Sequence, residues 1–181
     1  MSTHAPDALL SNDVALPPWD LSGAALVMLQ RVGLRRGAIA VVALVRYDAS
    51  PVGVYLERAV AVMTRRGPSV VEMQVSSFDS MRGGRRGWGY PKTMGDLKWR
   101  EETKAVVFDA RFENRSRVYR SRAFGPSFPI AVRAWSAQTL NEKSIRAPFT
   151  LRGRARLAWM NRRLGVFVES FAMCVSPPVA A

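Results

Sequence analysis

The sequence contains one cysteine and one histidine in 181 residues, and both shortages exclude large classes of functional site. Cys174 stands alone, so neither an intrachain disulfide nor a cluster of thiolate metal ligands can form. His4 lies in a polar N-terminal segment, which leaves no histidine inside the fold for a Ser-His-Asp or Cys-His arrangement or a histidine-rich metal centre. The side chains left for chemistry are lysine, aspartate, glutamate, tyrosine and arginine.

The sequence also lacks an apolar run long enough to cross a bilayer. The longest candidate, Ala38–Val45, has the length of a strand. The N-terminus has no basic segment followed by an apolar core, so it does not resemble a secretory signal. We therefore expect a cytoplasmic protein with no membrane contact.

Lysine is scarce as well, with 4 lysines against 23 arginines. An arginine cannot lose its proton in a protein, whereas a lysine amine becomes a nucleophile where burial or a nearby cation lowers its pKa. Lys92 follows Pro91 in the glycine-rich stretch Gly83–Met94, GGRRGWGYPKTM. Two interpretations follow from composition alone: Lys92 supplies a primary amine that the chemistry needs, or it is an ordinary solvated lysine on a surface turn.

The formal net charge of +13 is compatible with nucleic-acid binding. The arginines, however, are scattered in short pairs such as Arg35-Arg36 and Arg162-Arg163, and no helix or tail concentrates them. The sequence shows no helix-turn-helix, zinc-finger or RNP-type aromatic pattern. We therefore do not expect a nucleic-acid partner.

The length and composition predict a single folded domain. A chain of 181 residues can bury one core, and 48% apolar with 23% charged residues is typical of a folded protein. The expected divisions are a partly ordered N-terminal extension over residues 1–20, one β domain over residues 21–176 and a C-terminal tail over residues 177–181.

Short β-branched and apolar runs between turn residues predict strands along most of the chain. The expected strands are Ala24–Val32, Ala38–Tyr47, Val54–Met63, Ser69–Ser76, Asp96–Arg100, Lys104–Phe112, Arg117–Ala123, Ile130–Trp135, Thr150–Met160 and Gly165–Cys174. Turns are expected at Gly33–Gly37, Asp48–Gly53, Arg65–Pro68 and Glu113–Arg115, and a short helix over Ser77–Arg86. Because helical periodicity is missing elsewhere, we predict a mainly β protein with minor α: an antiparallel β-barrel or sandwich with one or two short helices.

Within Ser69–Ser76 the residues alternate in polarity. Val71, Met73 and Val75 are apolar, whereas Glu72 and the other intervening side chains are polar. A strand places alternate side chains on opposite faces, so this pattern predicts one buried and one solvent-facing side.

Two ordered motifs resemble those of the acetoacetate decarboxylase family. Gly84-Arg85 precedes Pro91-Lys92 at the interval of the family's Gly-Arg and Pro-Lys pairs. Upstream, Gly53-Val54-Tyr55-Leu56-Glu57 resembles the family's Gly-x-Tyr-x-Glu segment. The resemblance covers roughly residues 38–125 and marks the chain as a divergent, shortened relative. It implies the β-barrel of that family and favours the functional interpretation of Lys92.

The resemblance implies a lyase that acts on a small oxo acid through a Schiff base on Lys92, with no cofactor. In that chemistry the amine attacks the carbonyl, and the resulting iminium accepts the electrons released as CO2 leaves. The resemblance assigns Glu57 as the acid–base or orienting carboxylate and Tyr55, Trp88 and Tyr90 as pocket residues. From the residues alone, Glu57 is equally well a solvated carboxylate at a strand edge, and packing is the favoured role of Trp88 and Tyr90. Relatives use the same lysine for aldol and dehydration reactions, and barrels of this family often form homo-oligomers, which we expect here too.

The chain departs from the family pattern at three positions that bear on activity. Thr93 stands where the decarboxylases carry a second lysine, so the adjacent cation is lost, and Lys92 keeps a more ordinary pKa unless Arg85, Arg86 or burial replaces that cation. The family's second pocket glutamate aligns near Val42, within an apolar run. The arginine that binds the substrate carboxylate has no clear match, and Arg31 and Arg46 are its stand-ins.

We accordingly predict Lys92 and Glu57 as catalytic residues, with no metal. The predicted substrate-binding residues are Tyr55, Arg85, Trp88, Tyr90, Thr93 and Arg46. Two alternatives stay open: a relative that kept the cavity but lost the chemistry, acting as a small-molecule-binding or structural protein, and a basic nucleic-acid-binding protein.

Overall fold

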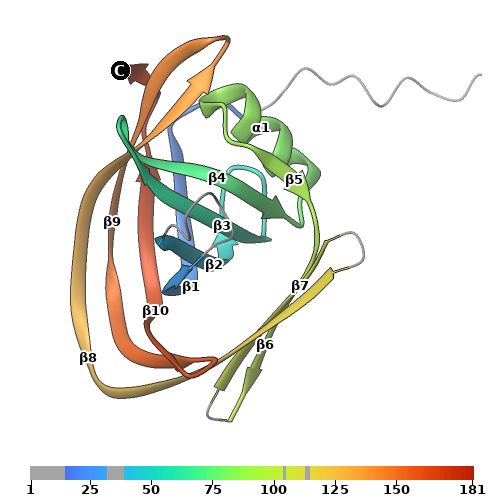
Figure 1. The fold of residues 1–181 in the computed structure, drawn as a ribbon, viewed down its shortest axis with the longest axis vertical. Helices are drawn as coiled ribbons and strands as arrows, with labels where there is room; N and C mark the ends of the chain where they lie inside the picture. Colours follow the sequence, from blue (N-terminus) through green and yellow to red (C-terminus); the bar gives the residue numbers. More distant parts are fainter. Residues whose placement is uncertain (1–14, 32–38, 104, 113–114) are drawn as a thin grey trace, which may run out of the picture.

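The computed structural model describes residues 15–31, 39–103, 105–112 and 115–181, and these form one large curled sheet with a helix beside it (Figure 1). The strands are β1 (Trp19–Arg31), β2 (Ile39–Ala49), β3 (Tyr55–Thr64), β4 (Gly67–Val75), β5 (Lys92–Met94), β6 (Asp96–Glu102), β7 (Ala105–Phe112), β8 (Arg115–Leu140), β9 (Lys143–Met160), β10 (Arg163–Val175) and β11 (Val179–Ala180), and the helix is α1 (Phe78–Trp88). The mainly β class with a minor helical part is confirmed. No helix in the described residues has the length and apolar character that crossing a membrane requires.

The sheet has the strand order β5-β4-β3-β2-β1-β10-β9-β8-β7-β6, and β11 pairs with β9. Neighbouring strands pair antiparallel except β4 and β5, which run parallel. The long strands β8 and β9 curve around the molecule until β8 meets β4, where Gln138 Nε2 donates to the Val70 carbonyl oxygen at 3.4 Å (Figure 1). The predicted antiparallel sheet is therefore a mixed one.

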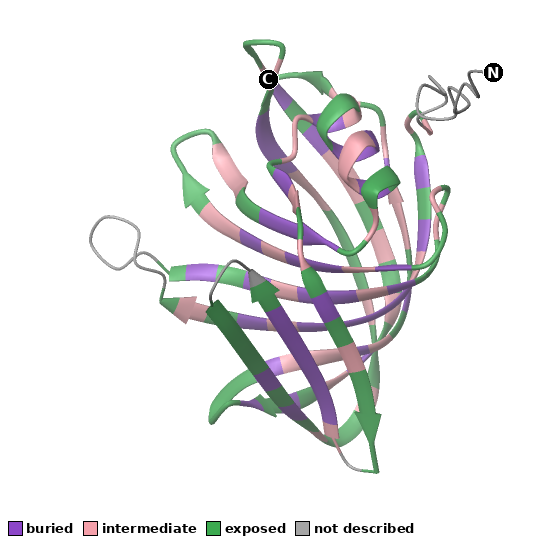
Figure 2. Cartoon of the chain, turned by 90° about the vertical axis from the view of Figure 1, so that its right-hand side faces the viewer, coloured by how far each residue is buried: buried purple, intermediate pink, exposed green. Residues whose placement is uncertain are grey.

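The central strand β2 is buried on both faces, which explains its continuous apolar sequence. Val42 and Leu44 belong to a core cluster shared with the β6–β7 hairpin. Val45 and Tyr47 point to the opposite side, into a second cluster shared with β10. Buried positions therefore run along the middle of the strands, while the turns at their ends are exposed (Figure 2).

Capping explains why helix α1 forms although its sequence contains three glycines. Ser77 is the N-cap, and its Oγ accepts from the Ser80 backbone N–H at 3.2 Å. Gly89 ends the helix with a left-handed φ of 64°, and its N–H donates to the Arg85 carbonyl oxygen at 3.1 Å. The predicted helix, Ser77–Arg86, is confirmed and extends two residues further, to the buried Trp88.

Several predicted boundaries are corrected. β1 begins at Trp19, inside the expected N-terminal extension, and Val179–Ala180 of the expected tail pair with β9. The two strands predicted around residues 117–135 form the single strand β8, whose pairing with β9 is irregular between Phe124 and Phe128. The predicted turn at residues 33–37 lies outside the described residues, as does most of the tip at residues 113–115.

The polarity alternation predicted for residues 69–76 holds over only part of β4. The β3–β4 register shifts between Val60 and Ala61, which leaves Val71 as an extra residue in β4. Val71 is therefore exposed. Gln74, predicted to face solvent, is buried for a different reason: Met73, Gln74 and Val75 are all buried, so both faces of β4 are covered at this end. A bulge changes which positions face the core, and residue polarity alone does not reveal one.

Leu44 on β2 and Leu29 on β1 test the assignment of buried and exposed positions in the sheet. Leu44 has no exposed surface, whereas Leu29 on β1 is 61% exposed. We expect Leu44→Ala to lower the free energy of unfolding by about 2–5 kcal/mol because it leaves a cavity, and Leu29→Ala by about 0.5 kcal/mol or less. Urea denaturation of the two variants measures the difference, and equal losses would contradict the burial assignment.

Candidate active site

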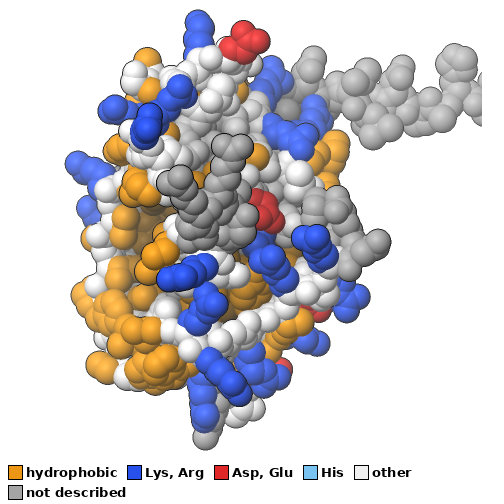
Figure 3. Space-filling view, in the orientation of Figure 1, with side chains coloured by type: hydrophobic (Ala, Val, Ile, Leu, Met, Phe, Trp, Pro, Cys, Tyr) orange, Lys and Arg blue, Asp and Glu red, His pale blue; other side chains and the backbone are white. Residues whose placement is uncertain are grey.

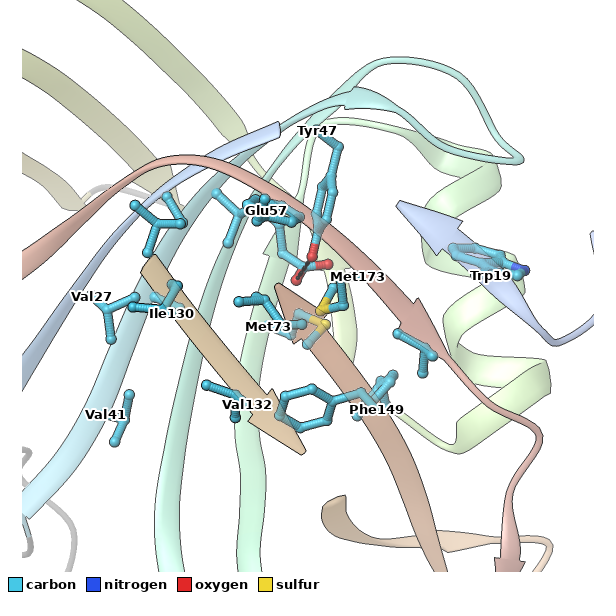
Figure 4. Close-up of a pocket in the computed structure, with 18 of the residues that line it drawn as sticks. Trp19, Val27, Val41, Tyr47, Glu57, Met73, Ile130, Val132, Phe149 and Met173 are labelled. Carbon is cyan, nitrogen blue, oxygen red and sulfur yellow. Dashed lines mark hydrogen bonds between the residues drawn. The ribbon is translucent and has the colours of Figure 1, made fainter. Parts of the chain in front are cut away.

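A cavity of about 550 Å³ lies inside the curled sheet, between the inner faces of its strands and the C-terminal end of α1. In Figure 4 the Glu57 carboxylate and the Tyr47 hydroxyl point toward each other above Met73 and Met173. Almost all other lining side chains are apolar. The lining residues are Trp19, Ala25, Val27, Val41, Ala43, Val45, Tyr47, Glu57, Met73, Trp88, Tyr90, Lys92, Ile130, Val132, Phe149, Leu151, Val166, Val168, Phe171, Met173 and Val175.

Lys92 and Glu57 form a buried ion pair on the wall of this cavity. Lys92 Nζ lies 2.9 Å from Glu57 Oε2, and the two residues are 3% and 5% exposed. They come from separate strands: β3 carries Glu57, and the parallel pairing of β5 with β4 places Lys92 beside Met73. Among the lining residues of the described chain, Glu57 is the single carboxylate and Lys92 the single cation.

Two buried hydroxyl groups complete the polar contacts of the pair. Tyr47 OH donates to Glu57 Oε1 at 3.2 Å, and Lys92 Nζ donates to Ser80 Oγ at 2.9 Å. Burial raises the pKa of Tyr47 well above its ordinary value, and the nearby Glu57 carboxylate adds to that shift. Tyr47 therefore stays protonated and holds Glu57 as a hydrogen-bond donor.

Aromatic rings and a glycine shape the surroundings of the lysine amine. Lys92 Nζ lies 5.4 Å from the Tyr55 ring centroid and 5.7 Å from that of Trp19, distances at which a cation is attracted to the ring face. The aliphatic part of the Lys92 side chain packs against α1 at Gly84. A Cβ at position 84 would lie 2.5 Å from Lys92 Cε, so Gly84 leaves the space that the stem occupies.

The structure brings together five of the eight predicted site residues. Lys92, Glu57, Trp88 and Tyr90 line the cavity, and Tyr55 lies under the lysine amine without lining the space. Tyr90 OH forms a hydrogen bond of 3.1 Å with Ser136 Oγ, and burial raises the pKa of Tyr90 to about 12.

The other three predicted residues lie outside the cavity lining, so their positions do not support a substrate contact. Arg85 Nε donates to the Lys92 carbonyl oxygen at 2.6 Å and so holds the backbone of the site. Thr93 Oγ1 donates to the Met73 carbonyl oxygen at 3.3 Å. Arg46 pairs with Asp48 at 2.8 Å and with Glu101, and it lies over the Trp99 ring.

The position aligned with the family's second glutamate also lies away from the cavity. Val42 is fully buried in the cluster on the opposite face of β2. Along β2 the cavity is lined by Val41, Ala43, Val45 and Tyr47, none of which is acidic. Tyr47, a hydrogen-bond donor, is the polar group that β2 contributes.

Sequence reasoning missed Tyr47 and Ser80 as partners of the ion pair. The turn that it predicted between Asp48 and Gly53 pairs Tyr47 with Tyr55 and thus brings Tyr47 close to Glu57. Hairpin register was therefore a usable signal for Tyr47. Ser80 offered none, since its contact with Lys92 depends on how α1 packs across the end of β5.

In the described part of the chain, no cluster of three or more His, Cys, Asp or Glu side chains is arranged to hold a metal ion. The chemistry that these residues can supply is proton transfer and amine nucleophilicity.

Comparison with known proteins identifies the fold. No protein-family model and no curated protein sequence matches the chain. Among solved structures, it is similar to acetoacetate decarboxylase from Legionella pneumophila, with a TM-score of 0.67 and 12% identity over 99% of this chain and 92% of that one. A second acetoacetate decarboxylase structure gives a TM-score of 0.60 and 10% identity over 98% and 95% of the two chains. The chain is thus a divergent protein with the acetoacetate decarboxylase fold.

Proposed function

We propose that this protein is a lyase that forms a Schiff base between Lys92 and the carbonyl carbon of an oxo acid. The observation that carries the proposal is the buried Lys92–Glu57 pair on the wall of an otherwise apolar cavity. A lysine with a solvated ammonium group is a poor nucleophile, whereas a carboxylate 2.9 Å from the amine can accept its proton. The shared fold supports the proposal without fixing the activity.

Imine formation needs proton transfers that this pair can perform without leaving an unbalanced charge. Transfer of a proton from Lys92 Nζ to Glu57 yields a neutral amine and a neutral acid. The amine attacks the substrate carbonyl, and the acid then protonates the hydroxyl group that leaves as water. The products are an iminium cation and the Glu57 carboxylate, so the opposite charges are restored side by side, and neither is buried alone.

The apolar walls favour loss of CO2 from the bound acid. No cation other than Lys92 lines the cavity in the described residues, so a substrate carboxylate gains no arginine partner there. Burial of an unpaired carboxylate is unfavourable, and its departure as CO2 removes that cost. The bonding electrons pass to the iminium nitrogen, giving an enamine. A proton taken up from solvent adds to the enamine carbon, and water then hydrolyses the resulting iminium, which releases the ketone and restores the Lys92 ammonium beside Glu57.

The same enamine supports aldol or dehydration chemistry. Among these reactions, decarboxylation is the one that the apolar cavity favours.

On the face shown in Figure 3, Lys and Arg side chains are scattered rather than gathered into one patch. This distribution favours a small-molecule partner over nucleic acid. The cytoplasmic location and the homo-oligomeric state stay predictions.

Borohydride trapping tests the Schiff base. With acetoacetate present, reduction is expected to add the mass of the trapped substrate or its decarboxylated product to Lys92, as peptide mass spectrometry shows. Lys92→Arg keeps a cation beside Glu57 but cannot form an imine, so it is expected to abolish the adduct. Lys98→Arg, which changes an exposed lysine, is the matched control. If no oxo acid gives an adduct on Lys92, the proposal is wrong and the protein is a non-catalytic binder.

Glu57→Gln tests proton transfer. It retains a polar side chain of the same size but cannot accept the Lys92 proton, so imine formation is expected to slow by about 100-fold or more. The rate of trapping after mixing with acetoacetate measures this effect. Glu101→Gln, at an exposed carboxylate, should leave the rate unchanged. An unaltered rate in Glu57→Gln would assign the proton transfer to another group.

Gly84→Ala tests whether the path of the lysine stem positions the amine. The added Cβ would displace Lys92 Cδ and Cε, and trapping is expected to fall by up to about 100-fold while the fold persists. Gly87→Ala is the control in the same helix, because its Cβ would meet nothing closer than 3.4 Å. Both changes favour the helix by up to about 1 kcal/mol, so equal trapping in the two variants would refute the positioning role.

A further inference from the structure

The cavity is elongated, and its reactive groups are confined to one end. The β2 residues that line it run from Val41 to Tyr47, a length of about 20 Å at ~3.3 Å per residue. Val41 and Val132 are 42% and 44% exposed, so they mark the open end. Lys92 and Glu57 are buried, and in Figure 4 Val41 lies away from Glu57.

Every other polar group on the described walls already has a protein partner. Trp19 Nε1 donates to the Ala15 carbonyl oxygen at 3.0 Å, and Trp88 Nε1 donates to that of Ser176 at 2.7 Å. Tyr90 OH is bonded to Ser136, and Tyr47 OH to Glu57. The body of a ligand would therefore meet hydrocarbon, thioether and ring surfaces, with polar recognition restricted to the Lys92 end.

A bulge in β10 keeps this wall apolar along its whole length. The β10–β9 register shifts between Val168 and Ser170, and β1 shows the matching shift on the other side. The inward positions consequently change from Val166 and Val168 to Phe171, Met173 and Val175. Unbroken alternation would have turned Ser170 and Cys174 inward.

We propose that the cavity selects a substrate with an elongated apolar chain, which extends from the Lys92 end toward Val41 and Val132. This inference rests on the proposed function, which places the carbonyl group of the substrate at Lys92. A volume of about 550 Å³ lies within the range of ~300–1,000 Å³ found for pockets that bury drug-sized ligands, and a small oxo acid would use little of it. The substrate class is a 3-oxo acid with an alkyl chain, and the products are a methyl ketone and CO2.

A homologous series of methyl ketones, from acetone to 2-undecanone, tests the inference through two readouts. The first is displacement of the neutral dye Nile red, and the second is borohydride trapping at Lys92. Each added CH2 group is expected to lower the half-effective concentration about four-fold until the chain reaches the open end. Ala43→Phe narrows the cavity between its two ends, so the gain should stop at a shorter chain while acetone is still trapped.

Ala49→Phe is the control, since it makes the same change at an exposed position of β2. Ala43→Leu serves the same purpose if the phenylalanine variant does not fold. Trapping that is independent of chain length, or a length dependence unchanged in Ala43→Phe, overturns the inference and leaves the proposed function standing. Displacement that depends on chain length without any trapping supports the apolar occupant and overturns the proposed function.

Discussion

The site depends on a buried ion pair, Lys92 with Glu57, in which neither charge could stay buried without the other. Removing one member of such a pair leaves an uncompensated charge that costs about 3–5 kcal/mol, whereas replacing both with apolar side chains is often neutral or stabilising. The pair is therefore weak evidence for stability and better evidence for chemistry. Several separate features maintain it: the parallel pairing of β5 with β4, the space left by Gly84, and hydrogen bonds from Tyr47 and to Ser80.

The double-sided burial of the central strands lets one sheet build both a packed core and a hollow. Val42 and Leu44 fill the cluster that the β6–β7 hairpin covers, while Ala43 and Val45, their neighbours in β2, face the cavity. The packed face supplies much of the apolar burial that stabilises the fold. The other face can then remain open without an equivalent loss, because small side chains such as Ala43 leave the space unfilled.

The sequence predicted what is encoded locally. Strand patterns, the short helix over Ser77–Arg86 and the two motifs that carry Glu57 and Lys92 depend on neighbours along the chain. Val71 was misplaced because a bulge appears only when β3 and β4 pair. Arg46 was assigned to the substrate because its charge fits a carboxylate, but its position on β2 turns it toward Glu101 on β6. Such outcomes depend on register and on contacts between distant segments.

The distribution of charge links the chemistry to the kind of molecule that the cavity accepts. The protein carries 23 arginines, yet none lines the described cavity, and Arg85, the arginine that binds the Lys92 backbone, is engaged with a carbonyl oxygen. An acid that enters such a space meets only one cation, Lys92, and the positive charge of the iminium formed there is already balanced by Glu57. In the proposed reaction, expulsion of CO2 removes the unpaired carboxylate, and the remaining chain and ketone match the apolar walls better than the acid does. The absence of arginine from the described cavity lining therefore favours the decarboxylation proposed above.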